Sequence, residues 1–511
     1  MQLGFTFSFL LATVLLALSP NVEAAPVKRA GIVTLPLKRI HQARNDVHPF
    51  MLLQQHINRG LKRYARMTGR EAPSDLELRA HIHKRMYIPA TGPGSRKPAV
   101  DKRFNRSGVS HISEPVTTLV NNAATKGGKG KNRNKNAAAG TGATNGTASN
   151  GGAGFSEVDL EAALKGTLAP AGNPTADNSL GLDIEANDVG YIATVQMGTP
   201  PRDFKLLMDS GSADLWVGGE NCQSEDGGDC GNHVFLGSGS SSSFVDTKQQ
   251  FQVTYGSGAV AGDIITDDIN VAGLDLKAHK FGVATQETVD FSSNQTPFDG
   301  LMGLAQSTLS QQQTLTPVEA LSKNGLIQDA ITSYKISRLA DGKNDGEITF
   351  GGLDQTKFDA NTLVTFDNVN KQGFWEGAMT VSVNGQDLGL KGRTAILDTG
   401  TTLVIAPAAD ATAVHQAIPG AKSDGQGGFT IPCTTTASVA LTFGGQTFDI
   451  NPQDLLFVPV DQNDLQGDCV SGISSGNIGG DAEWLVGDVF LKNAYFSTDV
   501  TKNQISLAKL V

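Results

Sequence analysis

The chain has 511 residues, of which 39% are hydrophobic and 18% are charged, and its formal net charge at pH 7 is −10. The net charge conceals a division, because residues 26–150 hold 23 Lys and Arg against 6 Asp and Glu, whereas residues 151–511 hold 18 against 44. A basic segment can indicate nucleic-acid binding. The N-terminus indicates export, however, and an exported chain rarely meets nucleic acid. We therefore expect no nucleic-acid partner and expect the basic segment to contact the acidic remainder of the chain.

Residues 1–24 form a predicted signal peptide. An apolar run over residues 5–18 has the length of a signal-peptide core, and Val22-Glu23-Ala24 offers small residues for cleavage. A membrane anchor is the alternative, but the run is short for a bilayer span and becomes polar at Ser19. No later segment has enough uninterrupted apolar residues to span a membrane. We expect an exported protein without stable membrane association, either secreted or delivered to a vacuole.

Residues 25–120 form a predicted basic propeptide. Leu53, Ile57, Leu61 and Tyr64 recur at helical spacing with basic residues between them, which predicts one amphipathic helix. A processing protease could cut at the dibasic pairs Lys28-Arg29, Lys38-Arg39, Lys62-Arg63, Lys84-Arg85 and Lys102-Arg103.

Residues 121–180 form a predicted disordered linker and maturation region. From Asn121 to Gly154 no apolar residue is larger than Ala, and Gly, Asn, Lys and Thr dominate. Such a stretch cannot bury enough surface to offset its chain entropy. The mature N-terminus is expected within about residues 104–185.

The remainder of the chain has the pattern of an all-β protein with few short helices. Short β-rich runs alternate with Gly, Asp and Asn turns at residues 190–195, 205–208, 251–255 and 378–385, and the clearest helical pattern covers residues 317–323. About 330 residues of mostly β structure are many for one core. We therefore expect two lobes, residues 181–370 and residues 371–511.

The two lobes carry a weak internal repeat. Residues 206–212 read Leu-Leu-Met-Asp-Ser-Gly-Ser, and residues 395–402 read Ala-Ile-Leu-Asp-Thr-Gly-Thr-Thr. Each copy is followed later by two apolar residues and a glycine, at residues 301–303 and 485–487. One Asp-Ser-Gly is a common surface turn, but two matched copies predict a pseudo-twofold site.

The predicted catalytic residues are the repeated aspartates, Asp209 and Asp398. An apolar strand that enters Asp-x-Gly places the carboxylate at the end of the strand, and the glycine permits a tight turn. Two carboxylates about 3 Å apart cannot readily both ionise, so they share one proton. The ionised carboxylate can then activate water while its protonated partner donates to the scissile carbonyl. We expect an acidic pH optimum and no metal or cofactor.

From about residue 185 to Val511 the chain resembles the pepsin family of aspartic proteases, in order and with similar spacing. Tyr255-Gly256-Ser257-Gly258 resembles the flap hairpin of that family, and Trp216 matches the tryptophan that bonds the flap tyrosine. The stretches at residues 373–375 and 484–490 match as well. The resemblance implies a bilobal fold and hydrolysis of peptide bonds in a polypeptide substrate by a monomer.

The resemblance also implies roles for further residues. The substrate-binding residues would be Gly211, Tyr255, Gly256, Ser257, Gly400 and Thr401. Supporting residues would be Ser210, Ser212, Trp216, Thr399 and Thr402, and the weaker candidates for apolar pocket walls are Phe291, Leu301 and Phe374.

Four cysteines in an exported chain predict two disulfides with three alternative pairings. Proximity favours Cys222–Cys230 and Cys433–Cys469, and both pairs correspond to disulfides of the pepsin family. A zinc site is disfavoured because there is no Cys-x-x-Cys pair. In the enzyme part the glycosylation candidate is Asn294, although Pro297 after the sequon reduces its expected use.

The propeptide is expected to act as an intramolecular inhibitor, because residues 32–39 resemble the start of the segment that covers the cleft in this family. Opposite charges would hold it at neutral pH and release it as carboxylates become protonated. A sorting signal or spacer is the alternative, and cleavage at a dibasic pair is an alternative to self-activation. The sequence does not indicate which basic residue meets the aspartates.

Two other functions explain part of the sequence. A catalytically inactive pepsin-like binding or inhibitor protein would share the fold, but such relatives usually lose an aspartate, its glycine or the flap tyrosine. A secreted carbohydrate-binding β protein accounts for the turns and disulfides but not for the paired Asp motifs.

Overall fold

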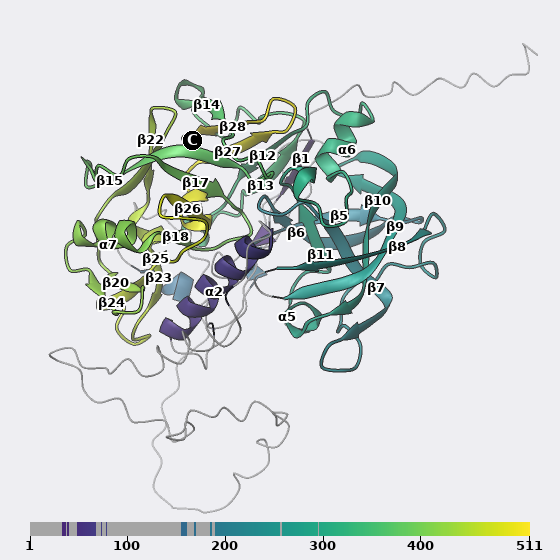
Figure 1. The fold of residues 1–511 in the computed structure, drawn as a ribbon, viewed down its shortest axis with the longest axis horizontal. Coiled ribbons are helices and arrows are strands. Elements are labelled where there is room, and N and C mark those ends of the chain that lie inside the picture. The colour runs from purple at the N-terminus through teal and green to yellow at the C-terminus, as the bar shows by residue number, and fades with distance from the viewer. Residues whose placement is uncertain are drawn as a thin grey trace, which may run out of the picture.

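The computed structural model describes residues 33–36, 38–39, 49–67, 73, 78, 155–160, 168–169, 184–185, 190–255, 258–294 and 296–511. The predicted signal peptide and most of the predicted linker therefore lie outside the described residues. Within the described part, the chain is mostly β structure arranged as two lobes (Figure 1). The all-β, bilobal prediction is confirmed.

The sheet of the first lobe has eight described strands. Their order is β2 (Lys38–Arg39), β5 (Tyr191–Met197), β6 (Arg202–Asp209), β11 (Gly300–Gly303), β7 (Leu215–Ser224), β10 (Leu274–Glu287), β9 (Ala259–Val271) and β8 (Val245–Thr254). Three of these strands, β5, β6 and β8, contain or overlap predicted β-rich runs. The short helix α5 (Val289–Ser292) follows β10.

The second lobe contains two sheets among its described residues. The larger has the order β22 (Gln446–Ile450), β21 (Val439–Phe443), β15 (Glu376–Val383), β17 (Arg393–Leu397), β26 (Glu483–Val486), β18 (Val404–Ala406) and β25 (Ile473–Ser475), and β16 (Gln386–Asp387) pairs with β15. The smaller has the order β19 (Lys422–Ser423), β20 (Phe429–Pro432), β24 (Asp468–Ser471) and β23 (Leu456–Pro459). The helices α7 (Ala408–Gln416) and α8 (Asp488–Leu491) also belong to this lobe.

A six-stranded sheet joins the ends of both lobes. Its order is β1 (Val33–Pro36), β13 (Glu347–Phe350), β12 (Ile331–Lys335), β27 (Tyr495–Asp499), β28 (Gln504–Ala508) and β14 (Val364–Asp367). The C-terminal strands therefore pair with strands that precede the second lobe, and a strand of the predicted propeptide pairs with β13. A separate two-stranded pair is formed by β3 (Leu168–Ala169) and β4 (Ile184–Glu185).

Two helices were predicted, and both are present. The first, α6 (Pro317–Lys323), has the predicted bounds and begins with a capping box between Thr316 and Glu319. The second, α2 (Pro49–Met67), is the basic amphipathic helix, and it lies across the second lobe with one end at the junction of the lobes (Figure 1). Among the described residues, no helix has both the length and the apolarity needed to cross a membrane.

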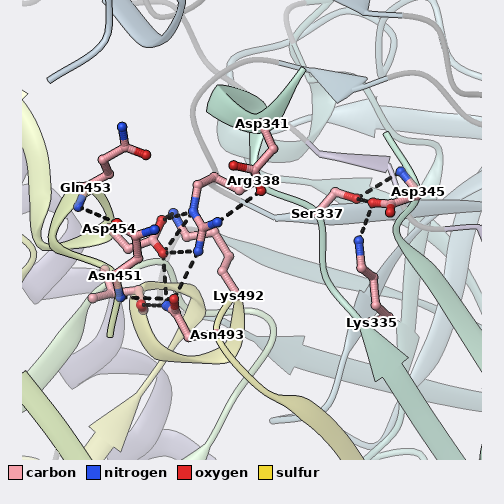
Figure 2. Close-up of polar contacts among 11 residues, drawn as sticks. Lys335, Ser337, Arg338, Asp341, Asp345, Asn451, Gln453, Asp454, Lys492 and Asn493 are labelled. Atoms are coloured by element: carbon pink, nitrogen blue, oxygen red, sulfur yellow. Dashed lines mark hydrogen bonds and ion pairs between the residues drawn. The ribbon is translucent and has the colours of Figure 1, made fainter. Parts of the chain in front are cut away.

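A buried ion cluster ties the segment that follows β12 to the second lobe (Figure 2). Asp454 accepts from Arg338 Nη2 at 2.6 Å and from Lys492 Nζ at 2.8 Å, and the Asn493 amide donates to it at 2.9 Å. Burial disfavours the charged form of Asp454, but Lys492 and Arg338 outweigh burial and lower its pKa to about 2. This carboxylate therefore stays ionised in moderately acidic solution.

Candidate active site

Asp209 and Asp398 occupy equivalent places in the two lobes. Asp209 is the last residue of β6, next to Gly303 of the parallel strand β11. Asp398 directly follows β17, whose final residue pairs with Val486 of the parallel strand β26. Both side chains are buried. The repeated apolar-strand-then-Asp pattern therefore has a structural counterpart in each lobe.

Equivalent donors hold the two carboxylates. The Gly211 amide donates to Asp209 Oδ1 and the Gly400 amide to Asp398 Oδ1, both at 2.9 Å. The Ser212 hydroxyl donates to Asp209 Oδ2 at 2.5 Å, and the Thr401 hydroxyl to Asp398 Oδ2 at 2.6 Å. These bonds orient the two Oδ1 atoms alike, and in both cases the turn supplies the donors.

Ser210 and Thr399 bind the two Asp-containing turns to each other. Each backbone amide donates to the hydroxyl of the other residue at 2.9 Å. The hydroxyls in turn donate across the junction, Ser210 to the Leu397 carbonyl at 3.1 Å and Thr399 to the Met208 carbonyl at 2.9 Å. The residues that directly follow the aspartates, Ser210 and Thr399, therefore join the two lobes. The residues three positions after the aspartates, Ser212 and Thr401, contact the carboxylates. Thr402 is buried, and its carbonyl accepts from the Val489 amide.

The two carboxylates lie close enough to meet one guanidinium group. Arg63 of α2 bonds Asp209 Oδ1 and reaches Asp398 Oδ1 at 3.1 Å through the same nitrogen, Nη2, while its Nη1 donates to the Gly400 carbonyl at 2.8 Å. Gly211 of the first lobe also lies close to the carboxylate of the second lobe, because a Cβ on Gly211 would lie 2.4 Å from an oxygen of Asp398. No side chain larger than hydrogen fits there.

The electrostatics of the pair follow from burial and from these neighbours. Burial is the largest cause and raises the pKa of Asp398 to about 6; Arg63 opposes this shift, and the neighbouring Asp209 adds to it. Burial opposes the charge on Arg63, but the two aspartates outweigh it and raise the pKa of the guanidinium. Arg63 is therefore fully charged in this position.

The rest of α2 packs on the second lobe. Leu53 and Ile57 are buried against Phe457 of β23 and Val470 of β24, as their helical spacing predicted. The Tyr64 ring stacks on Phe374 at 5.6 Å, and its hydroxyl donates to Glu483 at 2.6 Å.

An aromatic group lies at the turn end of the hairpin formed by β8 and β9, where Tyr255 directly follows β8. Trp216 Nε1 donates to the Tyr255 hydroxyl at 2.8 Å, and the Phe291 ring lies 5.3 Å from the first ring and 5.6 Å from the second. Leu301 belongs to the same cluster, whereas Phe374 lies in another, beneath Tyr64. Gly256 and Ser257, the predicted tip of the flap, lie outside the described residues.

Both disulfides have the pairing that proximity favoured, Cys222–Cys230 and Cys433–Cys469. Asn294 is exposed, and its side-chain oxygen accepts from the Asn232 amide at 2.7 Å.

Arg63 is the site residue that the sequence left unplaced. It was one of several basic residues on the predicted helix, and its partners are 146 and 335 residues away in the chain. The sequence did contain one local signal, a glycine at position 60 inside the helical pattern. In the structure a Cβ there would lie 2.5 Å from Ile405 of β18, so the glycine lets the helix lie close to the second lobe at this turn. Arg63 follows three residues later on the same face.

Comparisons with known proteins agree with this geometry. Residues 190–510 match the model of the eukaryotic aspartyl protease family. The chain is 36% identical over 340 residues to a probable aspartic-type endopeptidase CTSD of Trichophyton verrucosum, covering 66% of this chain and 64% of that protein. It is 34% identical over 339 residues to the aspartic-type endopeptidase ctsD of Aspergillus fumigatus, covering 66% and 69%.

A further relative is rhizopuspepsin of Rhizopus chinensis, which is 33% identical over 327 residues, covering 63% of this chain and 79% of that protein. The chain spans less than two thirds of the length of the Trichophyton relative. The family match nevertheless covers more than half of the chain and includes both aspartates and the hairpin. The chain therefore belongs to the eukaryotic aspartyl protease family.

Proposed function

We propose that this chain is the inactive precursor of an aspartic endopeptidase that hydrolyses peptide bonds between apolar side chains in acidic solution. The observation that carries the proposal is the pair of buried carboxylates, Asp209 and Asp398, which face one guanidinium and are held by matching donors. The names of the relatives, aspartic-type endopeptidase and rhizopuspepsin, support the same activity.

Hydrolysis would begin once Arg63 has left the carboxylates. Losing this cation removes the influence that lowers the pKa of Asp398, so Asp398 would carry the shared proton. Ionised Asp209 would accept a proton from a water held between the carboxylates, and that water would attack the scissile carbonyl. Asp398 would donate its proton to the carbonyl oxygen, which gives a tetrahedral diol. Asp209 would then pass the proton taken from water to the nitrogen as the C–N bond breaks, and Asp398 would recover a proton as the carbonyl re-forms. The two carboxylates thus carry every proton transfer in this sequence.

Substrate would lie extended across the space that α2 occupies in the precursor. Gly211, Gly400 and Thr401 border the dyad and would contact the peptide backbone, with Tyr255, Gly256 and Ser257 of the hairpin on the other side. Phe291 and Leu301 would form the wall of one apolar pocket. Phe374, which stacks on Tyr64 in the precursor, would contribute to another.

Inhibition in the precursor would come from the basic propeptide, residues 25–120. Arg63 bonds both carboxylates, and the apolar face of α2 covers the adjoining surface. Acid would protonate the dyad and weaken its attraction for Arg63, so the helix could leave. Activation that proceeds equally fast at neutral and acidic pH would refute this account. The product would be a monomer, either secreted or vacuolar.

The direct test is casein digestion by the acid-treated precursor with and without pepstatin, beside the variants Asp209→Asn and Asp398→Asn. Each substitution removes one half of the acid–base pair and should lower kcat/KM by about 10³- to 10⁴-fold. Mass spectrometry must show that the variants were processed, if necessary by added wild-type enzyme. A folded, processed wild type without activity on any unfolded substrate would favour the alternative, an inactive pepsin-like binding protein.

A further inference from the structure

A second segment of the chain before residues 190–510, which we call the enzyme body, lies on the second lobe. Phe155 is only 8% exposed and belongs to the hydrophobic core cluster that includes Cys433 and Cys469. Its backbone amide donates to the Cys433 carbonyl at 3.1 Å. Leu160 packs against the same cluster from the other end of this short segment, residues 155–160. We call this segment the anchor.

The anchor has its own local order. The Ser156 hydroxyl accepts from the Asp159 amide at 3.0 Å, as in a helix N-cap, and the Ser156 carbonyl accepts from the Leu160 amide at 3.2 Å. This turn places Phe155 and Leu160 toward the lobe while Val158, which is 54% exposed, lies on the outside.

The anchor and α2 contact different residues of the second lobe. The Phe155 amide bonds the carbonyl of Cys433, which directly follows β20, whereas Leu53 and Ile57 of α2 pack on Val470 of β24 and Phe457 of β23. The contacts that hold them are separate.

The two contacts also differ in chemistry. The end of α2 is held by an arginine on two carboxylates. The anchor is held by a buried phenyl ring, a partly buried leucine and a backbone hydrogen bond to the residue that begins the Cys433–Cys469 disulfide. Protonation of the catalytic carboxylates weakens the first contact and leaves apolar burial unchanged.

We propose that the surface beside the Cys433–Cys469 disulfide is a docking site for residues 155–160, and that the anchor stays on the enzyme when α2 leaves. The inference rests on the proposed precursor function. It implies that the piece of chain lost on activation lies upstream of Phe155, or that the anchor remains as a bound peptide if the chain is also cut after it.

The first experiment measures hydrogen–deuterium exchange in the full-length precursor at neutral pH. Phe155→Ala should accelerate exchange across residues 155–160 by about tenfold or more, because it removes a buried aromatic ring. Phe155→Leu should restore part of the protection. Val158→Ala is the matched control on the exposed side of the same turn and should leave exchange unchanged. Equal exchange in Phe155→Ala and the wild type would overturn the docking site.

The second experiment activates the precursor with acid, separates the products by size and identifies by mass spectrometry the peptides that accompany the active enzyme. Residues 155–160 should elute with the enzyme, covalently or as a bound peptide, while α2 elutes separately. Elution of the anchor with α2 from an active enzyme would overturn the proposal and leave the protease function intact. An inactive product that still retains the anchor would refute the function and leave the docking site intact.

Discussion

In two buried carboxylate clusters of this molecule, the pKa of an aspartate is shifted in opposite directions. Asp454 and Asp398 are both buried, and each has an arginine nearby. At Asp454 burial is outweighed by Lys492 and Arg338, and its pKa falls to about 2. At Asp398 burial and the neighbouring Asp209 outweigh Arg63, and its pKa rises to about 6.

The difference lies in where the cations come from. Arg338 and Lys492 belong to the enzyme body, so Asp454 keeps its partners throughout the life of the protein. Arg63 belongs to a helix of the predicted propeptide, so under the proposed function its carboxylates would have this cation only in the precursor. A permanent ion cluster can hold the fold together in acid, whereas a removable cation can restrain a reactive pair. Four predictions test this contrast.

The largest effect is expected from Asp454→Asn. It leaves Arg338 and Lys492 buried beside a neutral amide, which should lower the free energy of unfolding by about 3–5 kcal/mol. Urea denaturation near pH 5 measures this. Asp341→Asn is the matched control, because Asp341 also pairs with Arg338 but is half exposed, and it should cost less than about 1 kcal/mol. Equal losses in both variants would show that Asp454 contributes no more to the free energy of unfolding than the half-exposed Asp341 does.

Arg63→Gln should change latency rather than the fold. Without its guanidinium the helix loses its contact with both carboxylates, and the unprocessed precursor should cleave a fluorogenic peptide about 100-fold faster than the wild type, since such a factor corresponds to about 2.7 kcal/mol. Lys62→Gln, on the adjacent position of α2, is the control and should keep the precursor latent. An Arg63→Gln precursor that cleaves the peptide as slowly as the wild type would show that apolar packing alone closes the site.

Glu287 extends the comparison to a carboxyl whose pKa burial alone raises, to about 7. Its folded pKa lies above the ordinary value of 4.5, so its contribution to stability is complete below pH 4.5 and is lost as pH rises through about 7. Glu287→Gln stays neutral and should escape that loss, which amounts to about 3 kcal/mol. Thermal unfolding of both proteins between pH 4 and 8 checks this, and parallel curves would contradict it.

The smallest effect is expected from Tyr64→Phe. It removes the hydroxyl that donates to Glu483 but keeps the ring that stacks on Phe374. The loss of one hydrogen bond to a carboxylate should weaken the packing of α2 on the second lobe by about 1 kcal/mol. Acid activation should then be roughly fivefold faster. Stopped-flow fluorescence measures that rate. A change as large as that of Arg63→Gln would mean that Tyr64, not Arg63, controls release.

The sequence predicted those parts of the molecule that have a local pattern. Asp209 and Asp398 could be found because each follows an apolar strand in a repeated motif, and α2 because its apolar residues recur at helical spacing. Arg63 could not be chosen among its basic neighbours, since only tertiary packing distinguishes them. The partners of Asp454 lie 116 and 38 residues away, and nothing in the local sequence marks them.

The mutual hydrogen bonds of Ser210 and Thr399 give the active site a property that concerns folding order. The two residues are 189 positions apart, and each supplies an acceptor to the amide of the other. Contacts between such distant segments form late, because closing a long loop costs entropy before any contact repays it. Each lobe supplies one carboxylate and one of these hydroxyls, so under the proposed function a half-made chain would lack protease activity. Catalytic competence would then report that synthesis and folding of both halves are complete.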